Sequence, residues 1–268
     1  MLSTVISVMS YVGGKANSAS HILAVLNHPV FNGMHYVEPF VGYAHVLRRV
    51  INKRSYTASD ANPLLMLLLR AVQRGKSLPI VRDANEYHRL KHQRGTTLAR
   101  AVAAFTYSFN GKEWGGYTPT YKGCSSTVSR NPPDERRRYY KKLYENDAFR
   151  SARLTEASYH ELKPKHKLIY CDPPYEDTTG YSSHFDHDHF WDVMRAWSRD
   201  NIVFISEYRA PKDFVCVTSL EKNMILPGAD YTEKRVECLF THKSCLPLIA
   251  ERADYFNIKM GHILKSFK

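Results

Sequence analysis

Residues 167–175 read KLIYCDPPY, and this stretch decides the fold. It begins with a short apolar run, which predicts a buried strand. Pro173 and Pro174 cannot continue the hydrogen bonding of a sheet, so the strand must end there and the chain must turn. The turn places the Asp172 carboxylate, an exposed backbone carbonyl and the Tyr175 ring at the carboxyl end of that strand.

That end of a strand is where open α/β sheets bind their ligands. Asp172 and the carbonyl of Pro174 offer acceptors for an amino group, and Tyr175 offers a face on which a planar base can stack. These groups are what methylation of an amino group on a nucleobase needs. An isolated Asp-Pro-Pro-Tyr can also be a plain strand-ending turn, so the rest of the chain decides between the two interpretations.

Strands and helices alternate on both sides of this stretch. Strands are predicted at 35–40, 55–59, 168–171 and 201–206, and helices at 20–26, 44–50, 64–72 and 189–198. Pro63 suits the first position of the third helix. Two later runs, at 214–219 and 236–242, predict strands, the second an antiparallel hairpin partner. This order predicts an α/β fold with a doubly wound, Rossmann-like sheet.

The middle of the chain departs from this alternation. Helices are predicted at 86–91, 98–109 and 134–149, around a loop at 110–133 that is rich in Gly, Ser, Thr, Tyr and Pro. The simplest organisation is a catalytic domain formed by residues 1–75 and 150–268. An inserted, largely helical region, residues 76–149, interrupts it.

The net charge of the 268-residue chain, +12, is concentrated in that middle part. Residues 70–167 hold 21 Lys and Arg but only 9 Asp and Glu, an excess of +12, whereas the remainder holds 17 of each. A concentrated excess predicts a face that binds a polyanion, most often nucleic acid. A solvated helical surface is the alternative, but the run Arg136-Arg137-Arg138 with Lys141 and Lys142 favours phosphate contacts.

Cysteine usage indicates a reducing compartment. The five cysteines (124, 171, 216, 238 and 245) are scattered and never spaced Cys-x-x-Cys, which argues against a zinc site or a disulfide framework.

No apolar stretch is long enough for a bilayer, and the N-terminus lacks a signal-peptide pattern, so we expect a cytoplasmic protein without membrane partners. The cluster HFDHDH, at 184–189, matches no closed zinc pattern and is better explained as a helix start. No metal is predicted.

A second group of candidate residues follows the first two strands. The first ends in Glu38-Pro39-Phe40-Val41-Gly42, and Asp60 ends the next strand 18 residues later. Doubly wound nucleotide-binding folds use an acid at about this spacing to bind ribose hydroxyls. The glycine turn lacks the three-glycine pyrophosphate pattern, which counts against a dinucleotide. An adenosine ligand without pyrophosphate fits better, and S-adenosyl-L-methionine is such a ligand.

Together these motifs resemble the Dam-like family of DNA adenine-N6 methyltransferases, in the order that places the cofactor half before the catalytic half. The matching pieces are Tyr11-x-x-x-Lys15, EPFVG at 38–42, SDAN at 59–62, FNG at 109–111, DPPY at 172–175, SEY at 206–208 and ECLF at 237–240. Each piece is weak alone, but the ordered set is specific and covers most of the chain.

The resemblance implies a site-specific methyltransferase that acts on double-stranded DNA. The residues expected at the S-adenosyl-L-methionine site are Tyr11, Lys15, Glu38, Phe40, Gly42, Asp60 and Asp172. The target adenine would be flipped from the duplex, at a cost of a few kcal/mol. The catalytic residues would be Asp172, Pro173, Pro174 and Tyr175: Tyr175 stacks on the base, while Asp172 and the Pro174 carbonyl accept the two N6 hydrogens. Transfer would be direct, without a covalent enzyme intermediate.

The DNA contacts are expected in the inserted region. The candidates are Asn110, Lys112, Lys122, Arg130, Arg136, Arg137, Arg138, Lys141 and Lys142. After FNG many relatives carry an arginine-asparagine pattern, whereas this chain has KEWGG at 112–116, so the recognition sequence does not transfer. The family usually carries more glycine after Gly42, whereas this chain has Tyr43, Ala44 and His45, and Tyr43 or His45 could crowd the methionine end.

Two other functions are compatible with the sequence. The same catalytic groups suit another amino group, such as cytosine N4 or an adenine of RNA. A catalytically silent DNA-binding protein on a methyltransferase fold is the alternative from another class, although the intact tetrad and Lys15 argue against it. A cognate restriction nuclease and the oligomeric state stay open.

Overall fold

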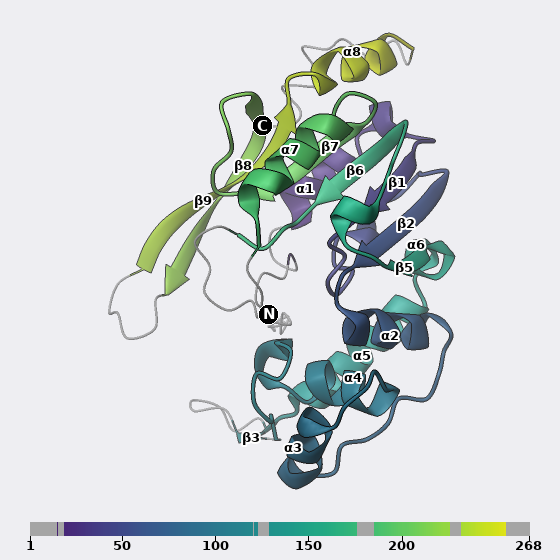
Figure 1. Cartoon of the computed structure of the whole chain (residues 1–268), viewed down its shortest axis with the longest axis vertical. Helices are drawn as coiled ribbons and strands as arrows, with labels where there is room; N and C mark the ends of the chain where they lie inside the picture. Colours follow the sequence, from purple (N-terminus) through teal and green to yellow (C-terminus); the bar gives the residue numbers. More distant parts are fainter. Residues whose placement is uncertain are drawn as a thin grey trace, which may run out of the picture.

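The protein is built on one large sheet and a group of helices beyond one of its edges (Figure 1). The computed structural model describes residues 15, 19–119, 121–122, 129–175, 185–225 and 232–255. The sheet has the strand order β5-β2-β1-β6-β7-β9-β8. The strands are β1 (His35–Glu38), β2 (Ser55–Asp60), β5 (Arg153–Glu156), β6 (Lys167–Cys171), β7 (Ile202–Glu207), β8 (Phe214–Ile225) and β9 (Thr232–His242). The first five are parallel, which confirms the predicted doubly wound α/β sheet.

The switch point of this sheet lies between β1 and β6. From β1 the chain adds β2 and then β5 on one side, and it later returns to add β6 and β7 on the other. β1 is parallel to both of its neighbours, so the carboxyl ends of β2, β1 and β6 meet at one edge. The sequence motifs that follow these three strands are therefore brought together.

The two antiparallel strands are longer than predicted. β8 and β9 stay paired from Phe214 opposite His242 as far as Ile225 opposite Thr232. β9 pairs with β7 only as far as Cys238, which lies opposite Glu207 at the end of β7. The outer part of the hairpin consequently extends past the carboxyl end of β7 (Figure 1).

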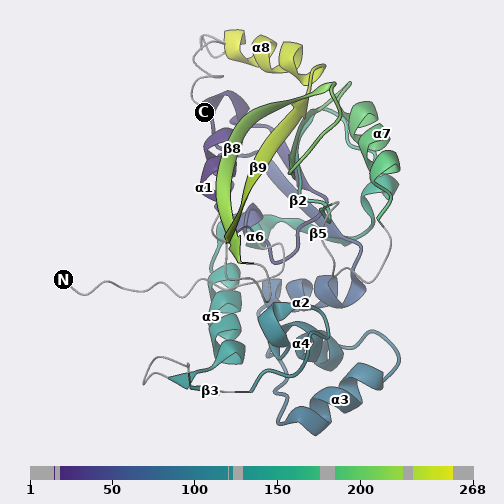
Figure 2. The ribbon, with the colours of Figure 1, turned by 90° about the vertical axis from the view of Figure 1, so that its left-hand side faces the viewer.

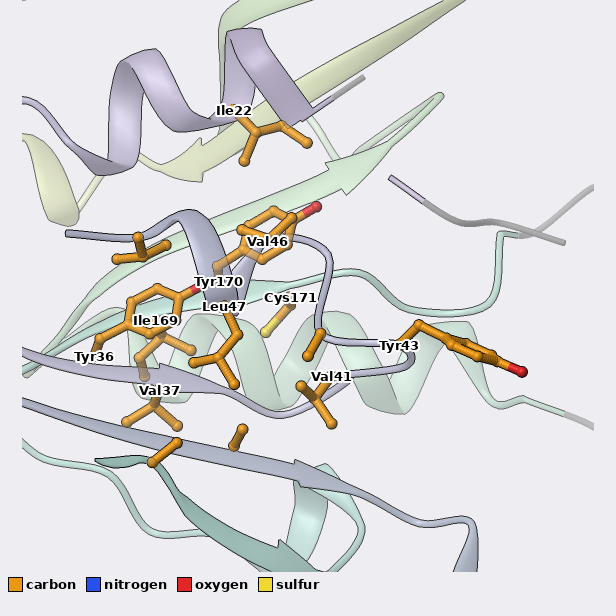
Figure 3. Close-up of a cluster of buried hydrophobic side chains, with 14 of the residues drawn as sticks. Ile22, Tyr36, Val37, Val41, Tyr43, Val46, Leu47, Ile169, Tyr170 and Cys171 are labelled. Atoms are coloured by element: carbon orange, nitrogen blue, oxygen red, sulfur yellow. The ribbon is translucent and has the colours of Figure 1, made fainter. Parts of the chain in front are cut away.

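The core forms on both faces of the central strands. Buried side chains of β1 and β6, among them Tyr36, Val37, Ile169 and Tyr170, pack together (Figure 3). The Tyr170 hydroxyl lies 2.8 Å from the Ser206 hydroxyl, which satisfies it in the interior. Helices α1 (Ala19–Leu26) and α7 (His187–Trp197) lie on opposite sides of the sheet (Figure 2). Burial of both faces is what a parallel sheet requires.

Side-chain caps explain where the helices begin. Asn62 accepts a hydrogen bond from the amide of Leu65, and Pro63 occupies the first position of α2 (Pro63–Gln73) as predicted. Asp186 caps α7 in the same way, which confirms that this acidic run starts a helix. His184, from the same cluster, lies outside the described residues. Within the described ranges no group of three or more His, Cys, Asp or Glu side chains is arranged to hold a metal ion.

The inserted region supplies three helices and a short hairpin. Helices α3 (Ala84–His92), α4 (Leu98–Thr106) and α5 (Pro132–Tyr144) lie beyond the carboxyl edge of the sheet, where α4 and α5 pack on α2 and α3 packs on α4 (Figure 1). The hairpin pairs β3 (Tyr121–Lys122) with β4 (Ser129–Arg130). Helix α6 (Asp147–Ser151) then returns the chain to the sheet, where it contacts β2.

Three helix predictions were wrong in extent. Residues 44–50 hold only the 3-10 turn Leu47–Arg49, because Ala44 has a left-handed φ of 57° that no α-helix accommodates. The helix predicted at 134–149 is divided between α5 and α6, since Asn146 caps the second one by accepting from the amide of Phe149. The helix predicted at 98–109 ends at Thr106, and Phe109–Gly111 forms a separate 3-10 turn.

The sequence patterns missed the β3–β4 hairpin inside the predicted loop at 110–133, and they also missed a strand and a helix elsewhere. Strand β5 is a short edge strand with no fully buried residue, so it lacks an apolar run. Helix α8 (Cys245–Tyr255) packs against the Pro29–Phe31 3-10 turn and against β7 and β9. None of the helices in the part of the chain that the structure describes could span a bilayer. The four described cysteines are all unpaired thiols.

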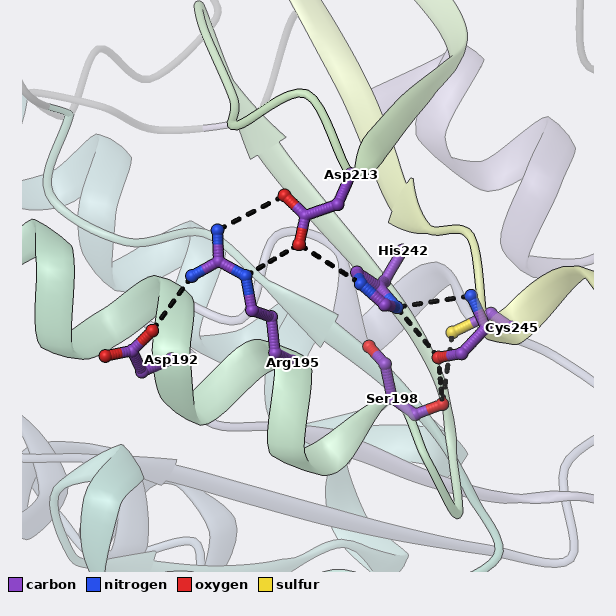
Figure 4. A network of polar contacts seen from close by, with 7 residues as sticks. Asp192, Arg195, Ser198, Asp213, His242 and Cys245 are labelled. Atoms are coloured by element: carbon purple, nitrogen blue, oxygen red, sulfur yellow. Dashed lines mark hydrogen bonds and ion pairs between the residues drawn. The ribbon is translucent and has the colours of Figure 1, made fainter.

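A polar network connects α7 to the start of β8 and to the end of β9 (Figure 4). Arg195 of α7 contacts both oxygens of Asp213, at 2.6 and 3.2 Å, and Asp192 at 2.9 Å. His242, at the end of β9, lies 3.2 Å from the same Asp213 carboxylate. The pKa of Asp213 is lowered to about 2, chiefly because Arg195 donates a hydrogen bond to its carboxylate.

We expect Arg195→Gln to destabilise the fold by about 1 kcal/mol or less at neutral pH, since this ion pair is partly exposed. A carboxyl whose pKa is depressed by folding stabilises the protein above its ordinary pKa of about 3.9. That contribution is lost as the pH falls through the folded-state value. The difference in free energy of unfolding between variant and wild type should therefore shrink below pH ~4, as measured by urea denaturation. The exposed Arg199, changed to Gln, is the control and should show no such pH dependence.

Candidate active site

Three neighbouring strand ends carry the predicted site residues. Glu38 ends β1, Asp60 ends β2 and Asp172 follows β6. Glu38 is buried and accepts a hydrogen bond from the Tyr36 hydroxyl at 2.7 Å. Burial raises the pKa of Glu38 well above its ordinary value. This side chain therefore bonds into the core below the site, and its contact with a cofactor stays a prediction.

The Asp60 carboxylate connects the first two turns. One oxygen accepts from the amide of Gly42 at 3.2 Å, and the other accepts from the amide of Asn62 at 3.0 Å. Gly42 has a φ of +48°, in the left-handed region that favours glycine. Burial raises the pKa of Asp60, while the two backbone hydrogen bonds oppose that rise. Asp60 thus holds both cofactor turns in one arrangement.

Phe40 lies in an aromatic cluster beside these turns. Its ring centroid is 5.4 Å from that of Tyr159, 5.9 Å from that of Phe190 and 6.1 Å from that of Phe185. Edge-to-face and tilted contacts of this kind fix the position of a ring. Phe40 is only partly buried, so part of its surface is available to a ligand.

Lys15 contacts the Asp-Pro-Pro-Tyr turn that follows β6. Its ammonium nitrogen lies 2.5 Å from Asp172 Oδ1, 3.2 Å from Glu237 Oε1 and within hydrogen-bonding distance of the Tyr175 hydroxyl. The Tyr175 hydroxyl also donates to Glu237, at 2.9 Å. Lys15 is 4% exposed, so these charges compensate one another in the interior. Tyr11, the other residue of this motif, lies outside the described residues.

The structure brings the whole Asp-Pro-Pro-Tyr turn to this cluster. Pro173 is buried, whereas Pro174 and Asp172 are partly exposed. The ring of Tyr175 meets that of Tyr208 edge to face, with centroids 4.8 Å apart. Burial, followed by the nearby Asp172 charge, raises the pKa of Tyr175 well above its ordinary value, so this hydroxyl keeps its proton. Stacking of Tyr175 on a base stays a prediction.

The residues that replace the small ones of the first turn contact the inserted region. Tyr43 is 2% exposed, and its hydroxyl lies 3.1 Å from the Phe105 carbonyl and 3.2 Å from the Gly111 carbonyl. Tyr139 donates to the Tyr43 carbonyl at 2.7 Å and packs on His45. Both side chains are directed into the interface with α4 and α5, and their effect on cofactor binding stays a prediction. Figure 3 shows Tyr43 extending away from the core cluster.

A second contact reaches the site from the loop that follows α4. Asn62 donates to Glu113 across 2.6 Å. With the Tyr43–Gly111 contact, this loop is attached to both cofactor turns. Of the predicted DNA contacts in it, Asn110 is exposed with a φ of +51°, and Lys112 is partly buried.

The basic helix α5 separates into a buried and an exposed face. Arg136 is 4% exposed and donates to the Thr106 carbonyl at 2.7 Å, so the prediction that it contacts phosphate is wrong. Arg137 is partly exposed and donates to the Leu78 and Pro79 carbonyls, so it holds that loop, and its contact with phosphate stays a prediction. Arg138, Lys141 and Lys142 are exposed. The side chains of Lys122 and Arg130 lie outside the described residues.

Sequence reasoning assigned no role to two acids of this site. Glu113 belongs to the KEWGG segment that departs from the family pattern, and nothing local indicated its partner. Glu237 stands in the strand motif ECLF. A carboxylate directly before the apolar run Cys238-Leu239-Phe240 is the signal that could have identified it, since such a group must be paired when buried.

The doubly wound sheet carries its ionisable cluster at the carboxyl ends of its central strands, where open α/β folds bind their ligands. Residues 11–98 match the family model described as D12 class N6 adenine-specific DNA methyltransferase. The match confirms the resemblance to the Dam-like family and the predicted enzyme class, an adenine-specific DNA methyltransferase. It includes Lys15 and both cofactor turns and ends before the Asp172 turn. No curated protein matches this sequence.

Two solved structures show a distant likeness. The rRNA methyltransferase aviRa from Streptomyces viridochromogenes has 11% identity and a TM-score of 0.38, over 86% of each chain. Precorrin-6y C5,15-methyltransferase from Geobacter metallireducens has 8% identity and a TM-score of 0.36, over 84% of this chain and 88% of that one. Likenesses of this kind do not identify a substrate.

Proposed function

We propose that this protein transfers a methyl group from S-adenosyl-L-methionine to N6 of an adenine flipped out of duplex DNA. The observation that carries the proposal is the position of Asp172. It is a partly exposed carboxylate at the carboxyl end of β6, directly beside the turns that Asp60 holds together. The family model for N6 adenine-specific DNA methyltransferases matches residues 11–98, the segment that contains those turns.

The donor set of the strand ends fits the proposed cofactor. Asp60 and the backbone of Gly42 offer polar groups for an adenosine, and Phe40 offers a ring beside them. Asp172 adds a negative charge that suits a sulfonium. When bound, S-adenosyl-L-methionine supplies an activated methyl group. Lys15, Phe40, Gly42, Asp60 and Asp172 are the described residues that would hold it.

The chain's own residues would then orient the target amine. Asp172 and the Pro174 carbonyl accept the two N6 hydrogens, which localises the nitrogen lone pair and aims it at the methyl group. The Asp172 charge also stabilises the positive charge that develops on N6. Holding the two reactants in one geometry supplies much of the remaining rate. Tyr175 stacks on the flipped base.

One incubation tests the proposed reaction. The protein is mixed with methyl-labelled S-adenosyl-L-methionine and unmethylated duplex DNA, and the product is digested to nucleosides. We expect the label in N6-methyladenosine of the DNA. Label in N4-methylcytosine, label only in a parallel RNA sample, or binding without transfer would identify the alternative functions instead.

We also propose that residues 76–149 recognise the DNA, with Arg138, Lys141 and Lys142 contacting phosphates. Replacing these three with Gln should weaken DNA binding. A plot of the logarithm of the binding constant against the logarithm of the salt concentration should become less steep, by about 0.9 for each phosphate that the variant no longer binds. Titrations of cognate and scrambled duplexes at several salt concentrations measure both.

A charge-matched triple variant controls for the change in net charge. Lys163, Lys165 and Arg199 are exposed in the segments that lead into β6 and β7, at the opposite edge of the sheet. Changing them to Gln removes the same charge and should leave the slope nearly unchanged. Equal slopes for the two triple variants would show that the α5 residues make no phosphate contact.

A further inference from the structure

Glu237 is a buried acid at the catalytic cluster that no part of the proposed reaction uses. Its side chain is 0% exposed and belongs to β9. It lies 3.2 Å from the Lys15 ammonium and accepts a hydrogen bond from the Tyr175 hydroxyl at 2.9 Å. A carboxylate without solvent is costly unless it is paired, so these two contacts account for its burial.

The position of Glu237 follows from the register of the hairpin. Cys238 is the last residue of β9 that pairs with β7, opposite Glu207. Glu237 is therefore the first residue of the hairpin beyond the carboxyl end of β7, at a level two residues past that of Asp172, because Cys171 and Phe240 both pair with Ile205. The pairing of Glu237 with Leu220 of β8 holds it at that level.

The two acids that share Lys15 differ in access. The Asp172 side chain is 18% exposed, whereas those of Glu237 and Lys15 are 0% and 3% exposed. An incoming amine can therefore reach Asp172 but not Glu237. The accessible acid is the one that the proposed reaction needs as an acceptor.

Lys15 and an amino group from a base would share the Asp172 carboxylate, of which Lys15 contacts Oδ1. A lysine ammonium has three donors and no acceptor, and here it meets Asp172, Tyr175 and Glu237. When the target amine donates to Asp172, the hydrogen bond between Lys15 and Asp172 weakens. Without a second acid, Lys15 would be left as an underpaired buried charge or would keep Asp172 occupied.

We infer that Glu237 is a positioning residue for methyl transfer, acting through Lys15 and Tyr175. It anchors the ammonium so that Asp172 is free to accept the target amine, and it fixes the hydroxyl end of the Tyr175 ring on which the base stacks. The inference rests on the proposed function and names a residue that this function alone does not require.

Two substitutions separate the charge of Glu237 from its shape. Glu237→Gln keeps an acceptor for Tyr175 and removes the charge, and Glu237→Ala removes both. We expect kcat to fall about 10- to 100-fold, more for Ala than for Gln, the scale of a modest misplacement of reacting groups. KM for DNA and the Kd of S-adenosyl-L-methionine should change less than about threefold, because neither ligand contacts Glu237.

A double-mutant cycle with Tyr175→Phe tests whether Glu237 acts through the tyrosine. The effects of Glu237→Ala and Tyr175→Phe on kcat should be less than multiplicative in the double variant, because both remove the same hydrogen bond. Glu221→Gln, an exposed acid on the partner strand β8, is the matched control and should keep wild-type kcat. Retained cofactor affinity shows that each variant is folded.

The outcomes distinguish this inference from the proposed function. If Asp172→Ala is inactive while both Glu237 variants keep wild-type kcat, only the role of Glu237 is wrong. Parallel decreases in kcat and cofactor affinity, or fully multiplicative effects in the cycle, would also overturn it. If the wild-type protein transfers no methyl group to any nucleic acid, the proposed function itself is wrong.

Discussion

Asp172→Ala is expected to lower the rate of methyl transfer by at least about 10²–10³-fold, the scale of removing one preorganised electrostatic interaction. Asp172 is the only carboxylate in its turn, and of the two acids that contact Lys15 it is the partly exposed one. The fold should survive, because Glu237 remains to pair with the Lys15 ammonium. Single-turnover rates with labelled cofactor measure the effect directly.

An exposed aspartate provides the control for this variant. Asp200 lies in the turn between α7 and β7, away from the carboxyl edge of the sheet. Asp200→Ala should keep the wild-type rate. Near wild-type turnover by a folded Asp172→Ala protein would contradict the proposed mechanism, since no other described group of the turn offers a charged acceptor.

The second large effect is expected on cofactor binding. Asp60→Ala removes the acceptor of two amides, those of Gly42 and Asn62, and so releases both cofactor turns. It also removes the acid expected to bind ribose hydroxyls. Removing hydrogen bonds to a charged group costs about 1.5–3 kcal/mol each, so we expect the Kd of S-adenosyl-L-methionine to rise by at least about tenfold. Calorimetry measures this affinity.

DNA affinity should fall less than cofactor affinity in the same variant. Glu156, the register partner of Asp60 on β5, is exposed and one strand further from the switch point. Glu156→Ala is therefore a matched control that should bind the cofactor normally. An unchanged cofactor affinity for Asp60→Ala would remove Asp60 from the site.

The inserted region and the cofactor turns are physically attached through the residues that depart from the family pattern. The Tyr43 hydroxyl contacts one carbonyl within α4, that of Phe105, and one after it, that of Gly111. Asn62 donates a hydrogen bond to Glu113. A loop of the inserted region is thereby anchored to the cofactor turns. Substitutions at Tyr43 should accordingly be judged by their effect on the inserted helices as well as on cofactor binding.

The exposed and buried faces of α5 show what closer use of the sequence could have predicted. Arg136, Tyr139, Tyr140 and Leu143 follow the i, i+3, i+4, i+7 spacing of one helix face, and all four are buried. A prediction from charge alone assigns phosphate contacts to every residue of the basic run, because it does not consider which helix face each residue lies on. The left-handed turn at Ala44, by contrast, lies next to Tyr43, whose contacts with Phe105 and Gly111 span more than 60 residues and belong to no local pattern.

The sequence by itself determined the doubly wound sheet and the edge at which the site lies. Apolar runs of strand length, the prolines at 173–174 and the glycine at 42 act locally, so their consequences are visible without a structure. Only the tertiary structure decided which charges meet there. Lys15 and Asp172 are 157 residues apart, and Glu237 joins them through the register of a hairpin. Buried charges must be compensated by whichever partners the strand order brings close, and that pairing is a property of the folded chain.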